Sequence, residues 1–293
     1  TFGYKVAVWL DEWLRHLDRL QEMRPRVLVG QCSGAVGSFA SLGRKGKSVQ
    51  REMMKRLGLT APRISWHTAR DSWAECVAFL AGMSATLAKI ATEVSTLMRS
   101  EIGEVGEPFE DGRGASSTLP QKRNPISSEP IIACAHKIRE CAGSQWIAMI
   151  QEHERGIGHI EIERMVVPEA FILASGALHH ATVILEHISV DAERMRTNLG
   201  SSGGLVMAEA VMMGLAPKVG KKTAHDWVYK AAGKAYEEGR PLKEALMADA
   251  RIMQNLSESE IDNLLDPGNY LGITSLMIDT VLQESRNGAG NRG

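Results

Sequence analysis

The residues best suited to chemistry gather in one stretch, 112–130, between two long helical patterns. The stretch brings together hydroxyl, cationic and amide side chains: Ser116, Ser117, Thr118, Lys122 and Asn124. Asn124 and Pro125 have the types favoured at the N-cap and first position of a helix, where unpaired N–H groups and the helix dipole attract anions. The stretch therefore predicts a flexible, glycine-flanked loop that presents hydroxyls beside a carboxylate or phosphate site. The alternative is a solvated Ser/Gly loop before a well-capped helix.

The run from Ala115 to Pro125, Ala-Ser-Ser-Thr-Leu-Pro-Gln-Lys-Arg-Asn-Pro, resembles the signature loop of the fumarase/aspartase superfamily, G-S-S-x-M-P-x-K-x-N-P. Ala115 and Leu119 depart from that pattern, and leucine for methionine keeps volume and polarity. The resemblance extends over essentially the whole chain. It implies an enzyme that removes a proton from the carbon next to a carboxylate, or runs the reverse, and expels a leaving group from the neighbouring carbon, without a cofactor.

The resemblance assigns roles within this loop. Ser116 matches the catalytic serine, and a serine acts as a base only where a cation or N–H groups stabilise its alkoxide in a closed, dry site. Lys122 and Asn124 match the groups that hold the substrate carboxylate and stabilise the aci-carboxylate. The remaining polar positions are expected to bind substrate: Ser117, Thr118 and Gln121.

A second polar group, Glu152-His-Glu-Arg155, interrupts the following helical pattern. A similar segment in adenylosuccinate lyases and 3-carboxy-cis,cis-muconate cycloisomerases implies that Arg155 lies at the substrate pocket, where its planar fork suits a carboxylate. Arg164 is a second candidate. The alternative is an ordinary charged helix terminus. The histidines and glutamates here lack the helical spacing of zinc ligands, so no metal is expected.

Three segments look most like the muconate cycloisomerase branch: 220–225, 239–242 and 266–272. Adenylosuccinate lyases commonly carry serine after the His-Glu-Arg arginine to grip a nucleotide phosphate, whereas this chain has Ile157, Ile160 and Ile162. Lys221 and Lys222 stand where both branches usually have arginine, which leaves the substrate open. We expect a small di- or tricarboxylate, handled by a cycloisomerase or by a C–N lyase of the adenylosuccinate or iminodisuccinate type. An inactive, crystallin-like relative is the non-enzymatic alternative.

Apolar residues at 3–4 spacing predict an all-α fold. Helices are expected at the start of the chain, where an apolar stripe runs from Val6 to Leu20, in a segment that ends at about Leu57, and over 68–99, 126–150 and 163–188. These five helices form a bundle, residues 1–189, whose two-sided stripes indicate helices shared between subunits. Residues 190–286 predict a small helical domain and 287–293 a disordered tail. The glycine-rich run 30–38 predicts close helix–helix approach, since a strand and a P-loop lysine are missing.

Composition narrows the function classes. The 293 residues carry a formal net charge of −1, which argues against a general nucleic-acid surface. We find no secretory signal and no apolar run expected to span a bilayer, so no membrane partner is expected. The four cysteines lack metal spacing and fit small buried thiols in a reducing cytoplasm.

The resemblance also implies a homotetramer whose active sites are each built from three subunits. The opening Thr1-Phe-Gly-Tyr-Lys5 is similar to a segment that follows a histidine motif and an N-terminal domain in the superfamily. We therefore expect this chain to be the C-terminal two-thirds of a longer protein and to be inactive by itself.

Overall fold

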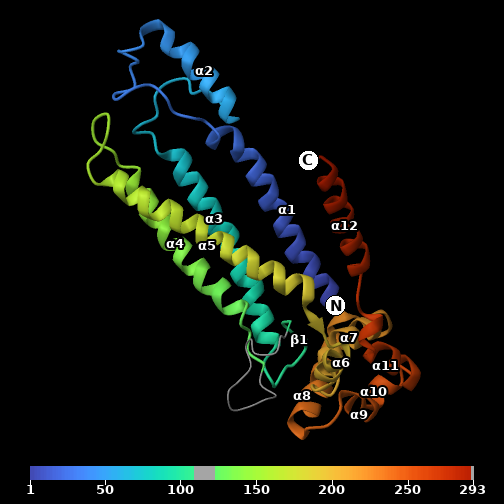
Figure 1. Ribbon diagram of the computed structural model, residues 1–293. Helices are drawn as coiled ribbons and strands as arrows, with labels where there is room; N and C mark the ends of the chain where they lie inside the picture. The colour runs from blue at the N-terminus through green and yellow to red at the C-terminus, as the bar shows by residue number, and fades with distance from the viewer. Residues whose placement is uncertain (109–122, 292–293) are drawn as a thin grey trace. The chain divides into compact units, whose positions relative to one another are not determined.

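The structure, a computed structural model, describes residues 1–108 and 123–291, and nearly all regular structure within these ranges is α-helical (Figure 1). The all-α fold class predicted from the sequence is therefore confirmed. Helix formation follows from a composition rich in alanine, leucine, methionine and glutamate, with apolar residues at helical spacing.

The chain divides into two compact units. The first comprises residues 8–100 and 105–189. The second comprises residues 1–7, 101–104 and the chain from 190 onward. Each unit has its own buried core.

Four long helices dominate the first unit: α1 (Phe2–Val27), α3 (Asp71–Leu97), α4 (Ser128–Ala148) and α5 (His159–His187). In Figure 1, α3, α4 and α5 run side by side, and they pack closely against one another. Each buries one stripe of small and apolar residues, which fixes the bundle. The shared core contains Val77, Leu80, Ala81, Met83, Ile138, Cys141, Ala170 and Ala174.

The fifth helix expected in this bundle is short. α2 (Gly46–Leu57) has 12 residues, follows the 3-10 turn η1 (Gly43–Lys45) and ends at Gly58 as expected, with φ +69°. The left-handed conformation of Gly58 lets its N–H bond back to carbonyls of the last turn. The five predicted helices are all present, but α2 is much shorter than the other four, because Gly58 ends it after about three turns.

The sequence predicts that the glycine-rich run 30–38 brings two helices close together, and this prediction is wrong. The run is a loop. A Cβ on Gly30 would lie 1.9 Å from the Met54 sulfur of α2, and one on Gly37 would lie 2.4 Å from the Ser65 side chain. The close approach is therefore between this loop and its neighbours, α2 and the segment that follows it.

Helix boundaries differ from the predicted ones by a few residues. α3 begins at Asp71 rather than residue 68, and α4 begins at Ser128 rather than residue 126. The largest difference is in α5, which begins at His159 instead of residue 163. Gly158 precedes it with φ +86°, so the chain turns into the helix as soon as the glycine allows.

The second unit contains seven helices among its described residues: α6 (Ala192–Gly200), α7 (Ala208–Val219), α8 (Lys221–Glu238), α9 (Leu242–Met247), α10 (Ala250–Met253), α11 (Glu258–Leu265) and α12 (Thr274–Asn291). Two 3-10 turns join them, η2 (Leu205–Met207) and η3 (Pro267–Asn269). Leu215, Val228, Leu242, Leu246 and Ile261 lie in its core.

Two-residue strands, β1 (Val105–Gly106) and β2 (Ser189–Val190), pair with each other. The expected disordered tail is wrong for residues 287–291, which continue α12, while residues 292–293 lie outside the described residues.

Two helices also correct the expectation about membrane spans. By length and composition, α3 and α5 are each apolar enough to cross a bilayer. In α3, 56% of the apolar window is buried within the structure, but in α5 only 28% is. Both helices are predicted to be core helices of a bundle, but within the described residues only α3 has most of its apolar window covered.

Candidate functional site

The structure describes the last part of the predicted signature loop, from residue 123 to the start of α4. Ser127, rather than Asn124, is the N-cap residue, so the predicted helix start at Asn124 and Pro125 is wrong by three residues. The Asn124 carbonyl oxygen accepts a hydrogen bond from the N–H of Ile126, 2.9 Å away, in the turn that leads into the helix. The other residues predicted for this loop lie outside the described residues: Ser116, Ser117, Thr118, Gln121 and Lys122.

The N–H groups at the start of α4 already have an anion. The Glu107 carboxylate accepts hydrogen bonds from the backbone N–H groups of Ser127 (2.8 Å) and Ser128 (2.9 Å), and from the Ser128 hydroxyl (2.5 Å). A carboxylate at a helix N-terminus is stabilised by the dipole as well as by these donors. The anion site that the sequence predicted at this helix start is therefore filled by the chain itself, and Glu107 is held to the start of α4.

A cluster at the other predicted site joins the loop between α4 and α5 to the segment before α3. Arg155 lies in that loop rather than at a helix terminus, and its Nη2 lies 3.3 Å from Nε2 of His67. Arginine can only donate, so His67 Nε2 accepts and its Nδ1 carries the proton. That Nδ1 is buried and makes no hydrogen bond with any described residue.

The charge state of His67 follows from its neighbours. Burial lowers the pKa of His67, and the positive charges of Arg155 and Arg70 lower it further. A neutral imidazole therefore stands beside a guanidinium, and the two offer N–H donors and one positive charge. Such a set of donors is suited to holding a carboxylate.

A buried ion pair fixes the frame around His67. Arg70 donates through Nε to Glu163 on α5 (2.9 Å) and through Nη2 to its other oxygen, and both side chains are at least 90% buried. Gln145 of α4 donates to the same carboxylate at 3.2 Å. The guanidinium also lies 5.1 Å from the centre of the Trp66 ring. These contacts hold residues 66–70, and with them His67, against α4 and α5.

Arg164 does not belong to this cluster. It forms an ion pair with Glu161 at 2.5 Å, and its side chain is 68% exposed. Successive helix residues point about 100° apart, so Glu163 faces the bundle while Arg164 faces outward. The structure thus brings Arg155 into a polar cluster, whereas within residues 1–108 and 123–291 the partner of Arg164 is the Glu161 carboxylate.

Sequence reasoning missed His67, Arg70, Gln145 and Glu163. Arg70 and Glu163 are 93 positions apart, and neither stands in a recognisable motif. One signal in the sequence could have pointed to this pair: Glu163 is a charged residue on the inward stripe of an apolar helix. A charged residue at such a position is almost never fully buried unless it has a partner of opposite charge.

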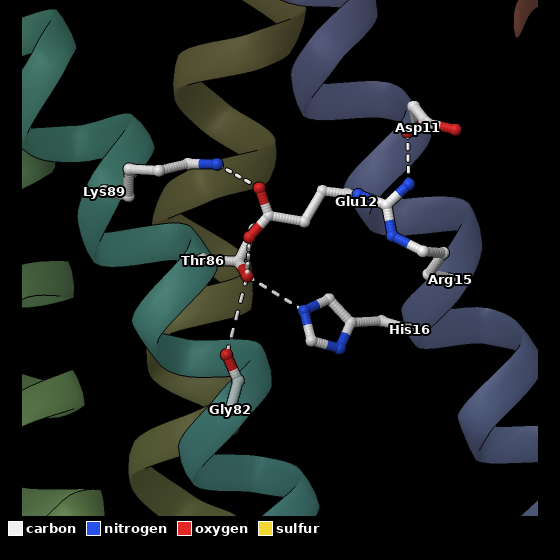
Figure 2. A network of polar contacts seen from close by, with 7 residues as sticks. All are labelled: Asp11, Glu12, Arg15, His16, Gly82, Thr86 and Lys89. Carbon is white, nitrogen blue, oxygen red and sulfur yellow. Dashed lines mark hydrogen bonds and ion pairs between the residues drawn. The ribbon is translucent and has the colours of Figure 1, made fainter.

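A second polar network lies between α1 and α3 (Figure 2). The Thr86 hydroxyl donates to Glu12 at 2.6 Å and accepts from Nε2 of His16 at 2.8 Å, while Lys89 pairs with the other Glu12 oxygen. Asp11 and Arg15 form a separate pair on the exposed side of α1. A groove of about 610 Å³ runs beside the network.

The proton positions in this network argue against a nucleophile. The hydroxyl hydrogen of Thr86 points to Glu12, so His16 does not act as its base. Burial would raise the pKa of Glu12, but hydrogen bonds from Lys89 and Thr86 outweigh it and the pKa is lowered. Burial, with Arg19, lowers the pKa of His16. The network therefore holds α1 against α3 with a neutral histidine. Among the described residues no three His, Cys, Asp or Glu side chains gather as a metal site.

Two protein families match parts of the chain. Residues 1–139 match the family described as Lyase, and residues 204–281 match that described as Adenylosuccinate lyase C-terminus. The chain belongs to the fumarase/aspartase superfamily. Two curated superfamily relatives are the 3-carboxy-cis,cis-muconate cycloisomerase of Pseudomonas aeruginosa, 43% identical, and the N-acetyl-S-(2-succino)cysteine lyase of Dickeya dadantii, 40% identical. Each match covers 97% of this chain and 62% of the relative.

A solved superfamily structure, the 3-carboxy-cis,cis-muconate lactonizing enzyme of Pseudomonas putida, matches with a TM-score of 0.91 and 39% identity over 98% of this chain and 63% of that one. The chain thus spans a little under two thirds of the length of the superfamily members it matches.

The buried pair yields a stability prediction. Glu163→Gln leaves Arg70 without its carboxylate and is expected to lower the free energy of unfolding by about 3–5 kcal/mol, because an uncompensated charge stays buried. Glu161→Gln, which breaks the exposed pair with Arg164, is the matched control and is expected to cost less than about 1 kcal/mol. Chemical denaturation measures both. Equal losses in the two variants would contradict a structural role for the pair.

The Thr86 network yields a pH prediction. Unfolded His16 takes a proton near its ordinary pKa of about 6.5, whereas folded His16 resists it. The unfolded state then binds more protons, so the free energy of unfolding falls as pH drops below about 6.5. His16→Gln is expected to flatten this slope between pH 7 and 5.5, and His187→Gln, at an exposed position on α5, serves as control. A slope equal to that of the wild type in His16→Gln would refute the assignment.

Proposed function

We propose that the complete protein is a cofactor-independent lyase or cycloisomerase that acts on a small di- or tricarboxylate. Similarity to a 3-carboxy-cis,cis-muconate cycloisomerase across 97% of the chain is the observation that carries this proposal. Ser116 serves as the base, with Lys122 and Asn124 holding the carboxylate whose neighbouring carbon loses the proton. Ser117, Thr118 and Gln121 bind the substrate. An intact set of these residue types argues against an inactive relative.

Arg155 and His67 are proposed to hold a further carboxylate of the substrate. The paired guanidinium and neutral imidazole supply a charge and N–H donors, and the buried Arg70–Glu163 pair keeps His67 in place. Ile157 is 90% exposed in the same loop, which favours an apolar substrate edge over a nucleotide phosphate. Arg164 is proposed to take part only after giving up its partner Glu161.

The leaving group separates two candidate reactions. The cycloisomerase reaction is favoured by the muconate relatives. A lyase reaction, with the leaving group joined through nitrogen as in adenylosuccinate or through sulfur as the name of the Dickeya dadantii relative indicates, is the alternative. Both need the same carboxylate grip and the same base, so the residues described here serve either one.

We further propose that the protein assembles as a homotetramer in a reducing cytoplasm. Four large apolar side chains of α5 are exposed: Phe171, Ile172, Leu178 and Leu185. Only 28% of the most apolar stretch of α5 is buried within the structure. Uncovered apolar rows of this kind favour association with further copies. All four cysteines are free, and burial raises the pKa of Cys76 to about 11, which suits unreactive thiols.

The activity prediction uses the complete gene product. Ultraviolet assays with 3-carboxy-cis,cis-muconate, adenylosuccinate and N-acetyl-S-(2-succino)cysteine are run on the wild type and on Ser116→Ala. Loss of muconate absorbance in the wild type alone would support the cycloisomerase, and turnover of the other substrates alone would support a lyase. A substitution of Ser116 that leaves every rate unchanged would overturn the mechanism. The isolated 293-residue chain is expected to show no turnover.

The assembly prediction concerns α5. Ile172→Lys places a charge on the uncovered apolar row and is expected to reduce the mass measured by light scattering, with the helical circular dichroism retained. Tyr229→Lys, at an exposed position on α8, is the control and should keep the mass of the wild type. A tetrameric mass in the Ile172→Lys variant would show that this row is not at the interface.

A further inference from the structure

A hollow of about 360 Å³ opens in the second unit between α8 and the region of α9 and α10. Its lining includes four residues with very small side chains: Ala231, Ala245, Ala248 and Ala250. Because an alanine side chain ends at Cβ, these positions leave space that larger residues would fill. The residues that line the hollow all belong to the second unit, and the function proposed above does not use them.

Four cationic side chains line the same hollow: Lys230, Lys234, Arg240 and Arg251. Lys230 and Lys234 are one helical turn apart on α8 and so project from the same face. Asp249 is the one carboxylate in the lining. A hollow with this lining has a strong excess of positive charge, in a chain whose formal net charge is −1.

The carboxylate in the lining is already engaged. Asp249 accepts hydrogen bonds from Nε (3.0 Å), Nη2 (2.5 Å) and the backbone N–H (3.0 Å) of Arg251. The side-chain hydrogen bonds from Arg251 lower the pKa of Asp249, so the carboxylate stays ionised at neutral pH. The Arg251 guanidinium also lies 5.3 Å from the centre of the Trp227 ring. Asp249 therefore neutralises Arg251 and leaves the other three cations uncompensated by the lining.

One further carboxylate, that of Glu238, lies near two of those cations. It lies 2.6 Å from Nε of Arg240 and 3.9 Å from Nζ of Lys234. The Arg240 Nε is nonetheless buried without a hydrogen bond, since the carboxylate lies off the direction of its N–H. Lys230 has no ion pair among the described residues. Four cations thus stand against two carboxylates, which leaves an excess of two positive charges.

We propose that this hollow binds a small dianion, either a phosphate or a short dicarboxylate. The excess of two positive charges matches such a ligand, and the alanine lining supplies the room that an anion needs to reach Lys230, Lys234 and Arg240 together. Charge-assisted hydrogen bonds from guanidinium and ammonium groups are the usual means of holding phosphate and carboxylate.

The test measures binding of inorganic phosphate and of succinate to the complete protein by calorimetry at low salt. The Lys230→Gln/Lys234→Gln variant is expected to bind at least about tenfold more weakly, since each tenfold loss corresponds to only about 1.4 kcal/mol. The Lys45→Gln/Lys55→Gln variant removes the same charge at two exposed positions outside the hollow and is expected to bind like the wild type. Because the proposed active site also takes a small dicarboxylate, only binding that an Arg155→Gln variant retains is assigned to the hollow, and the probe so retained identifies the dianion.

A second variant separates a built site from diffuse attraction. Ala248→Met fills the hollow without changing the charge, at an exposed position that should tolerate the longer side chain, and is expected to weaken binding as well. Circular dichroism verifies that each variant is folded. Absence of binding by the wild type at millimolar probe, equal weakening by both lysine pairs, or unchanged binding in Ala248→Met would each overturn the proposal.

Discussion

The first unit depends on one buried ion pair. Arg70 stands directly before α3, Glu163 stands in the second turn of α5, and Gln145 of α4 completes the carboxylate's contacts. Both side chains are at least 90% buried, so each charge is tolerable only while the other stays in place. The pair thereby fixes how three helices and the loop before α3 meet. The position of His67, three residues before Arg70, is a direct result.

The same pair explains why the Arg155 loop has a defined partner. Arg155 lies on an exposed loop without regular structure. Side chains on such loops are generally less constrained than those on helices. His67 is different, because it is tied to the buried Arg70 and is partly buried itself. Arg155 thus contacts an imidazole whose position the bundle sets, and the two together offer donors to a carboxylate. The proposed second grip of the substrate thus rests on rigidity supplied from inside the bundle.

The fold class and the superfamily could be predicted from the sequence for a physical reason. Apolar spacing of three and four residues is a local property, and the serine-rich run from Ala115 to Pro125 is a contiguous motif. Contacts between distant residues leave no such trace. The Arg70–Glu163 pair joins positions 93 apart, and the Arg155–His67 contact joins positions 88 apart. The helix start at Asn124 failed differently: its residue types fit a cap, but the carboxylate that takes the N–H groups comes from Glu107, 20 residues earlier than Ser127.

The Glu107 contact has a further consequence for anions in solution. A carboxylate tethered to the same chain competes at an effective concentration in the millimolar range or above, and it loses little entropy on binding. A free sulfate, phosphate or carboxylate must displace it before reaching the N–H groups of Ser127 and Ser128. The N–H groups of Ser127 and Ser128 are therefore occupied by the protein's own carboxylate and are less available to weakly binding anions.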